Sequence, residues 1–148
     1  MKLKLLVSKE HYSQIARELE EKGIEIDDNS NFILSECNAY ATYLIGRKDD
    51  EIFRLKTEDI THFESFAHDV FAYTEQGSYK INERLKTLSN LLDPQIFIRI
   101  SNSVILSVNH IQSIKPAFTQ KFIVTMSSGA KVDVTRTYYY IFKEFIGI

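Results

Sequence analysis

The chain contains a single cysteine among 148 residues, so no disulfide can form within it. A lone thiol is typical of a reducing compartment, and Cys37 is predicted to be a small core residue because neither Glu36 nor Asn38 favours its thiolate. No uninterrupted apolar run approaches the ~20 residues that cross a bilayer, and the first residues are too short an apolar patch for a signal peptide. We therefore expect a cytoplasmic protein that is not inserted in a membrane.

Glycine is also scarce, and the features of common catalytic sites are missing. There are five glycines, with no phosphate-binding glycine loop and no GxSxG motif. The four histidines, His11, His62, His68 and His110, do not have metal-ligand spacing with cysteine or carboxylates. The acids at 49–51 fall in a predicted exposed turn, unlike a buried general acid. We predict no enzyme activity, no cofactor and no metal site.

The composition is that of a globular protein with an uneven charge. Hydrophobic residues make up 44% of the chain and charged residues 26%, which suits one domain, or one domain with a small appendage. The net charge is -2, but residues 1–44 sum to -3, residues 45–92 to -2 and residues 93–148 to +3. The last third is therefore the part best suited to approach a polyanion.

Residues 1–44 read as a strand-helix-strand unit. Lys2–Val7 is a predicted strand, Ser8 is placed to cap a helix, Gly23 ends that helix, and Ile24–Ile26 is a second strand. The outward face of the helix is acidic, which is typical of a solvated surface.

Residues 45–148 show mainly strand patterns with two short helices. Asn82 is predicted to cap a helix that ends at Leu92, with either Leu91 or Leu92 buried, and Pro116 to break a strand. Turn-forming residues predict a turn at 46–50, a bend at 67–69 and hairpin tips at Gly77 and at 127–129. The strand-forming stretches include 52–55, 61–66, 70–74, 97–103, 105–111, 122–124 and 132–134. The pattern predicts a mainly β or α+β fold, mostly antiparallel, that ends in a helix over 138–146.

One stretch combines strand-forming bulk with a polar tip. In 97–111, Arg99, Ser101, Asn102 and Ser103 interrupt a run of Ile, Val, Leu and Phe. By pattern alone this is a polar turn between core strands. The ordered signals around it are Glu58-Asp59-Ile60, Phe63-Glu64-Ser65, an LxxL helix, Phe97-Ile98-Arg99-Ile100-Ser101, Ile111, a hairpin through Gly129, and Val134-Thr135-Arg136 before the last helix.

This ordered set, over residues 45–145, resembles the LytTR DNA-binding domain of bacterial transcription regulators. The resemblance implies an elongated, mostly antiparallel β fold that places loops in successive major grooves of double-stranded DNA. It implies base contacts by His68, with Asp69 beside it, by Asn102 and by Arg136, whose side chains can donate to or pair with base edges. Contacts to the DNA backbone are expected from Arg99, Ser101, Ser103, Lys121 and Lys131.

Alternatives remain open for these residues. Arg136 and Arg99 could pair with acids on neighbouring strands, and His68 could be a turn residue without a role. Many members of the family have Asn where this chain has Ser107, and the acids Glu64 and Asp69 add negative charge near the expected DNA face. The tyrosines at 138–140 are expected to be partly core rather than a stacking platform for bases.

The resemblance leads us to expect a transcription regulator without a receiver domain. We expect it to bind direct repeats in promoters, which brings two copies side by side and favours a homodimer. Residues 1–44 lie outside the match and are expected to mediate self-association or docking of an inhibitory protein. One alternative is a protein-interaction module whose DNA binding has been lost, and a further one is a small hydrolase or ligand sensor with a deep polar pocket.

Overall fold

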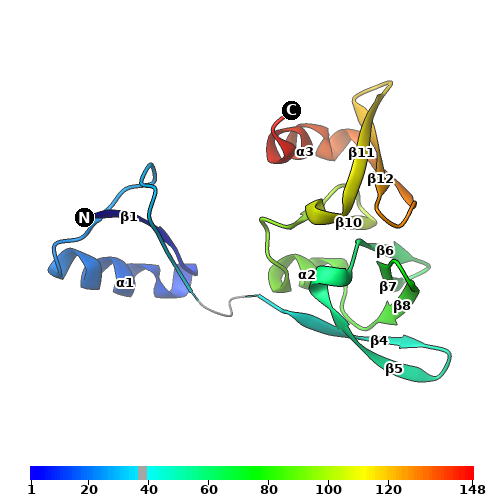
Figure 1. The fold of residues 1–148 in the computed structure, drawn as a ribbon, viewed down its shortest axis with the longest axis horizontal. Helices are drawn as coiled ribbons and strands as arrows, with labels where there is room; N and C mark the ends of the chain where they lie inside the picture. The colour runs from blue at the N-terminus through cyan, green and yellow to red at the C-terminus, as the bar shows by residue number, and fades with distance from the viewer. Residues whose placement is uncertain (37–39) are drawn as a thin grey trace. The chain divides into compact units, whose positions relative to one another are not determined.

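The computed structural model describes residues 1–36 and 40–148 (Figure 1). Contacts divide the chain into two compact units, Met1–Ala39 and Tyr40–Ile148, and each is described by itself. Cys37, which the sequence predicts to be a core residue, lies outside the described residues.

The first unit is a three-stranded parallel sheet with one helix. Its elements are β1 (Lys2–Leu6), α1 (Lys9–Glu21), β2 (Glu25–Ile26) and β3 (Ile33–Ser35), and the strand order is β2-β1-β3. Leu3 and Leu5 alternate with more exposed neighbours along β1 and pack against Leu19 of α1. The predicted strand-helix-strand arrangement is confirmed, and the strand that the sequence also predicts at 32–34 is found as β3, at one edge of the sheet.

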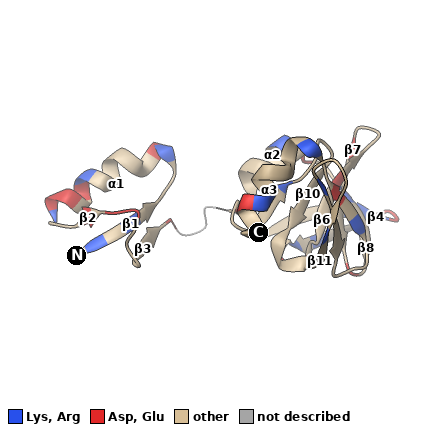
Figure 2. Cartoon of the chain, turned by 90° about the horizontal axis from the view of Figure 1, so that it is seen from above, with Lys and Arg blue, Asp and Glu red and all other residues tan. Residues whose placement is uncertain are grey.

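Helix α1 begins and ends where the sequence predicts. Ser8 is the N-cap residue, although its hydroxyl donates to the carboxylate of Glu36 at 3.1 Å instead of capping the helix. Gly23 has a φ of 73°, a left-handed conformation that glycine adopts without steric cost. Figure 2 shows that acidic residues gather toward the end of α1, where Glu18, Glu20 and Glu21 lie.

The second unit contains a seven-stranded antiparallel sheet. Its strands are β4 (Tyr43–Lys48), β5 (Glu51–Lys56), β6 (His62–Phe66), β7 (Asp69–Thr74), β8 (Gly77–Ile81), β9 (Phe97–Arg99) and β10 (Val104–Ser107), in the order β5-β4-β8-β7-β6-β10-β9. Helix α2 (Leu85–Leu91) covers one face and buries Leu85 and Leu88 against Phe63 and Ile105 of the sheet. Leu92, rather than Leu91, is the buried leucine at the end of this helix.

A smaller antiparallel sheet and the last helix complete the unit. The sheet has the order β11 (Ile111–Ala117), β12 (Lys121–Met126) and β13 (Lys131–Val134), and α3 (Tyr139–Ile146) follows it. Its buried side chains form a second core with Phe142 of α3 and with Val104 and Leu106 of β10. Because neighbouring side chains of a strand point to opposite faces, β10 also places Ile105 in the first core.

Short 3-10 turns connect elements of this unit. These turns are η1 (Thr57–Asp59), η2 (Val108–His110) and η3 (Arg136–Tyr138). The imidazole of His110 donates from Nε2 to the carbonyl of Glu58 at 2.6 Å and lies 3.2 Å from the hydroxyl of Ser127. His110 thereby links η1 and η2 with the β12–β13 turn.

Three details of the sequence-based assignment are wrong. The chain leaves the strand pattern at η2, so 105–111 is not one strand but the end of β10, a turn and the start of β11. Pro116 lies within β11 opposite Phe122, because β11 is an edge strand and tolerates a residue without an N–H. Helix α2 begins at Leu85 with Arg84 as its N-cap, because the chain is still paired in β8 at Ile81.

The predicted turn at 46–50 is also longer than the observed one. Asp49 and Asp50, with φ values of 50° and 63°, form the two-residue connection, and β4 continues to Lys48. Gly46 serves packing instead, since a Cβ at that position would lie 2.6 Å from Cδ1 of Leu55 and 2.8 Å from Cβ of Tyr79.

His62 of β6 is a buried titratable residue. Its exposed fraction is 2%, its ring stacks on Tyr73 with 4.3 Å between centroids, and its Nδ1 lies 3.0 Å from the hydroxyl of Thr61. Burial lowers the pKa of His62 from 6.5 to about 4, because the charged imidazole loses its hydration.

The pKa of His62 predicts a pH-dependent stability. The unfolded chain binds this proton near pH 6.5 and the folded protein only near pH 4, so stability is fully present above pH 6.5 and is lost as the pH falls toward 4. Over this pH range the free energy of unfolding falls by about 3 kcal/mol because of His62. The variant His62→Phe keeps an aromatic ring against Tyr73. Its free energy of unfolding, measured with urea, should fall less between pH 6.5 and pH 4 than that of the parent. The control His68→Gln replaces an exposed histidine and should decline as the parent does; a parallel decline in His62→Phe would contradict the assignment.

Candidate nucleic-acid interface

Three segments that are far apart in the sequence meet at one end of the sheets. They are the turn at 67–68 between β6 and β7, the tip at 101–103 between β9 and β10, and the stretch 135–138 after β13. The N–H of Ser65 donates to the carbonyl of Ser103 at 2.8 Å, and the N–H of Thr135 donates to the carbonyl of Ile100 at 3.0 Å. We call these three segments the polar edge; it carries His68, Asn102 and Arg136, the residues predicted to contact bases.

His68 lies in a strained two-residue turn. Ala67 and His68 have φ values of 49° and 70°, which cost side-chain-bearing residues about 1 kcal/mol or more each. The imidazole of His68 is exposed. Its neighbour Asp69 is paired with Lys80, with 3.3 Å between carboxylate and ammonium, so part of the negative charge expected at this face is neutralised.

An exposed aromatic residue precedes this turn, and the sequence patterns did not identify it. Phe66 is 73% exposed beside His68, at the last position of β6. The alternation of β6 places the side chain on the same face as those of Glu64 and His62. The sequence indicates this exposure only weakly, because a phenylalanine at the end of a predicted strand is ordinarily expected to be a core residue.

The tip carries an exposed amide that is held by a tyrosine. The side chain of Asn102 is exposed, and its Oδ1 accepts a hydrogen bond from the hydroxyl of Tyr138 at 3.4 Å. Ser101 is buried, and its hydroxyl lies 3.3 Å from that of Ser103 and accepts from the N–H of Ser103. Ser103 therefore offers more accessible surface than Ser101 to a ligand.

Arg99 faces the tip rather than a carboxylate. Its Nε donates to the carbonyl of Ser101 at 3.0 Å, and its Nη2 donates to the carbonyl of Asn102 at 2.6 Å. Arg136 is exposed at the start of η3. Among residues 1–36 and 40–148 neither arginine forms an ion pair, so neither is committed to an acid on a neighbouring strand.

The two lysines predicted to contact the DNA backbone lie at opposite ends of the small sheet. Lys121 begins β12, next to the Phe122 that pairs with Val134, so it lies toward the polar edge. Its ammonium is 3.9 Å from the carboxylate of Asp133. Lys131 pairs with Thr125 at the other end, about 10 Å along the strand from Val134. The geometry favours Lys121 over Lys131 as a neighbour of Arg136.

The tyrosines at 138–140 have three different environments. Tyr139 stacks on the core residue Phe122 with 4.7 Å between centroids, and Tyr140 is exposed with its hydroxyl accepting from Nε2 of Gln120 at 2.8 Å. Tyr138 binds Asn102, as described above. Because only one of the rings packs flat on the core and the other two make polar contacts, the run is not a continuous stacking surface.

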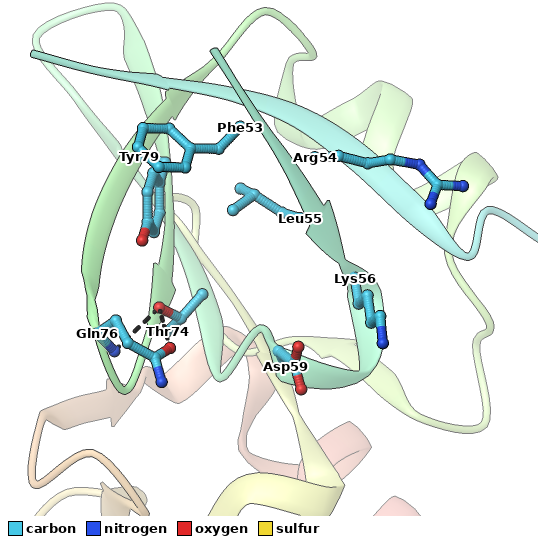
Figure 3. A pocket seen from close by; sticks show the side chains of 8 residues that line it. All are labelled: Phe53, Arg54, Leu55, Lys56, Asp59, Thr74, Gln76 and Tyr79. Atoms are coloured by element: carbon cyan, nitrogen blue, oxygen red, sulfur yellow. Dashed lines mark hydrogen bonds between the residues drawn. The ribbon is translucent and has the colours of Figure 1, made fainter. Parts of the chain in front are cut away.

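A cavity of about 240 Å³ (Figure 3) is lined by residues that are not part of the polar edge. Its lining comes from β5, η1 and the β7–β8 hairpin and comprises Phe53, Arg54, Leu55, Lys56, Asp59, Thr74, Gln76 and Tyr79. Figure 3 shows that Arg54 points away from Thr74 and Tyr79, so the polar groups do not converge. Within the described parts of the chain, no group of three His, Cys, Asp or Glu residues is placed to hold a metal ion.

The structure defines a class of mainly β domains whose polar loops gather at one end, with Arg136 exposed there. Residues 50–147 match the family model of the LytTr DNA-binding domain. The chain therefore belongs to the LytTR family, whose members are DNA-binding domains of transcription regulators and not enzymes.

Curated relatives agree with this membership. The transcriptional regulatory protein LytR of Staphylococcus aureus strain bovine RF122 / ET3-1 is 31% identical over 124 residues, which cover 82% of this chain and 50% of that protein. The sensory transduction protein LytT of Enterococcus faecalis is 31% identical over 100 residues, 68% of this chain and 41% of that protein. The chain thus spans about half the length of the LytR proteins it matches.

The fold is shared with a solved LytTr DNA-binding domain from Bacillus cereus. The two structures agree with a TM-score of 0.71 at 23% sequence identity, over 73% of this chain and 99% of that chain. The predicted mainly β fold with short helices is confirmed. In the residues that the structure describes, no helix is long and apolar enough to span a membrane.

Proposed function

We propose that this chain is a sequence-specific DNA-binding transcription regulator that reads base edges in the major groove with His68, Asn102 and Arg136. The observation that carries the proposal is the polar edge, which gathers three exposed side chains from segments of the chain that are more than 30 residues apart. Arginine suits guanine O6 and N7, asparagine suits adenine N6 and N7, and histidine can donate to N7 or phosphate. A cytoplasmic location agrees with this role.

The proposal assigns DNA phosphates to polar groups in the polar edge and to cations of the neighbouring strands. Ser103 and Lys121 are the best placed. Ser101, Lys131 and Arg99, the other expected backbone contacts, are less favoured, because Ser101 is buried, Lys131 lies at the other end of the small sheet and Arg99 donates to carbonyls of its own tip. Such contacts set the position of the protein on the duplex and carry no sequence information. Exposed Phe66 adds an apolar side chain beside His68 that suits a thymine methyl group.

Arg136→Ala tests base reading. It should lower affinity for a site selected from random DNA by roughly 1 to 3 kcal/mol and leave binding to unrelated DNA nearly unchanged, since the guanine contact is lost but few phosphate contacts are. Gel shift or fluorescence anisotropy at fixed salt measures both. Arg54→Ala removes an exposed arginine of β5, at the opposite edge of the large sheet from β9, and should bind as the parent does. If the parent binds no DNA even at low salt, the interaction-module alternative replaces this proposal.

Lys121→Gln tests phosphate contact. Removing one cation at a phosphate should weaken binding to all sequences about equally and reduce the slope of log K against log salt by about one unit. Salt titrations with selected and unrelated DNA give this slope. Lys56→Gln, an exposed lysine on β5, serves as the control, and an unchanged slope in Lys121→Gln would remove Lys121 from the interface.

The first unit is proposed to bring two copies together on repeated sites. Phe32, just before the edge strand β3, is 66% exposed, and Ile33, its first residue, is 59% exposed. An exposed apolar edge strand is a ready surface for pairing with a second chain. The same surface could instead receive an inhibitory protein.

Light scattering tests self-association. The full chain should show a concentration-dependent mass toward a dimer, whereas a chain that begins at Tyr40 should stay monomeric because it lacks β3. Ile33→Asp in the full chain should also lower the mass, since a charge on an edge strand opposes pairing. Equal monomeric masses for the full and shortened chains would exclude this role.

A further inference from the structure

The backbone of the tip between β9 and β10 is held by the protein itself. Four consecutive carbonyls, those of Ile100, Ser101, Asn102 and Ser103, each accept a hydrogen bond from a protein donor. The outer two donors are the backbone N–H groups of Thr135 and Ser65. Surface turns ordinarily leave such carbonyls to water, so this tip is unusually well ordered for an exposed polar loop.

The inner two carbonyls are bound by one side chain, Arg99. The guanidinium presents its donors in a rigid planar fork, so it can bridge the carbonyls of Ser101 and Asn102 at 3.0 and 2.6 Å. A lysine ammonium carries the same charge but has no fork and cannot hold both carbonyls in this geometry. Arg99 is half-buried, and its bond to Ser101 is partly buried while its bond to Asn102 is exposed.

We infer that Arg99 is a positioning residue that fixes the Asn102 tip for base reading, and that it is not primarily a phosphate contact. The inference rests on the proposed function. With its main chain held by Arg99 and its Oδ1 held by Tyr138, Asn102 presents its amide in one orientation before DNA arrives. Preorganisation of this kind lowers the cost of ordering the contact on binding.

The decisive experiment compares Arg99→Lys with Arg99→Gln in the full chain, on a site selected from random DNA and on unrelated DNA. A positioning role predicts that both variants lose about tenfold in affinity for the selected site and discriminate less at the base pair read by Asn102. Arg99→Lys should keep its affinity for unrelated DNA and its salt slope, because the charge is retained. Urea unfolding of each variant checks that the fold is intact.

A phosphate contact predicts a different pattern. Arg99→Lys would then bind nearly as the parent does, and only Arg99→Gln would lose about one unit of salt slope, on every sequence. That result overturns the inference. Equal loss of selected and unrelated DNA in Arg99→Lys also overturns it, because it reports general damage to the interface.

A double-mutant cycle separates positioning from independent binding. If Arg99 acts through Asn102, adding Arg99→Lys to Asn102→Ala should cost nothing further at the selected site. Full additivity of the two losses contradicts the inference. The proposed function fails separately, if the parent chain shows no preference for any selected DNA or if Asn102→Ala and Arg136→Ala both leave that preference intact.

Discussion

The burial of β10 on both of its faces is the constraint on which the second unit depends. Its side chains alternate between two cores, with Ile105 packed under α2 and with Val104 and Leu106 packed against the small sheet and α3. All four residues of the strand are buried. A shift of one residue in its pairing would move each of these side chains into the wrong core, so the register of β10 with β6 and β9 is strongly specified.

The position of the polar edge depends on this strand. The tip at 101–103 leads directly into β10, Ser65 of β6 donates to the carbonyl of Ser103, and Thr135 after β13 donates to the carbonyl of Ile100 just before the tip. Loops that carry function are usually positioned by a rigid scaffold in this way. Here the scaffold satisfies the main-chain carbonyls of the tip, which leaves the side chain of Asn102 as its exposed hydrogen-bonding group.

Local patterns predicted the elements that depend on neighbours in the sequence. The end of α1 at Gly23, the bend at 67–69 and the β12–β13 hairpin through 127–129 follow from glycine, turn residues and strand alternation, and the structure confirms them. The predictions of a strand break at Pro116 and of a turn beginning at Gly46 are wrong for the same reason. Whether proline lies on an edge strand, and whether glycine is needed for a close approach by Leu55 and Tyr79, depends on residues far along the chain.

The sequence alone determined the fold class, the membership in the LytTR family suggested by an ordered set of motifs, and the residue types at three polar segments. Only the tertiary structure decided that those segments share one edge, that Arg99 donates to the carbonyls of its own tip, and that Lys121 and Lys131 lie apart. The physical reason is that composition and periodicity specify local structure. The partner of a hydrogen bond such as that between Tyr138 and Asn102, in contrast, is chosen by packing between residues that the chain separates by 36 positions.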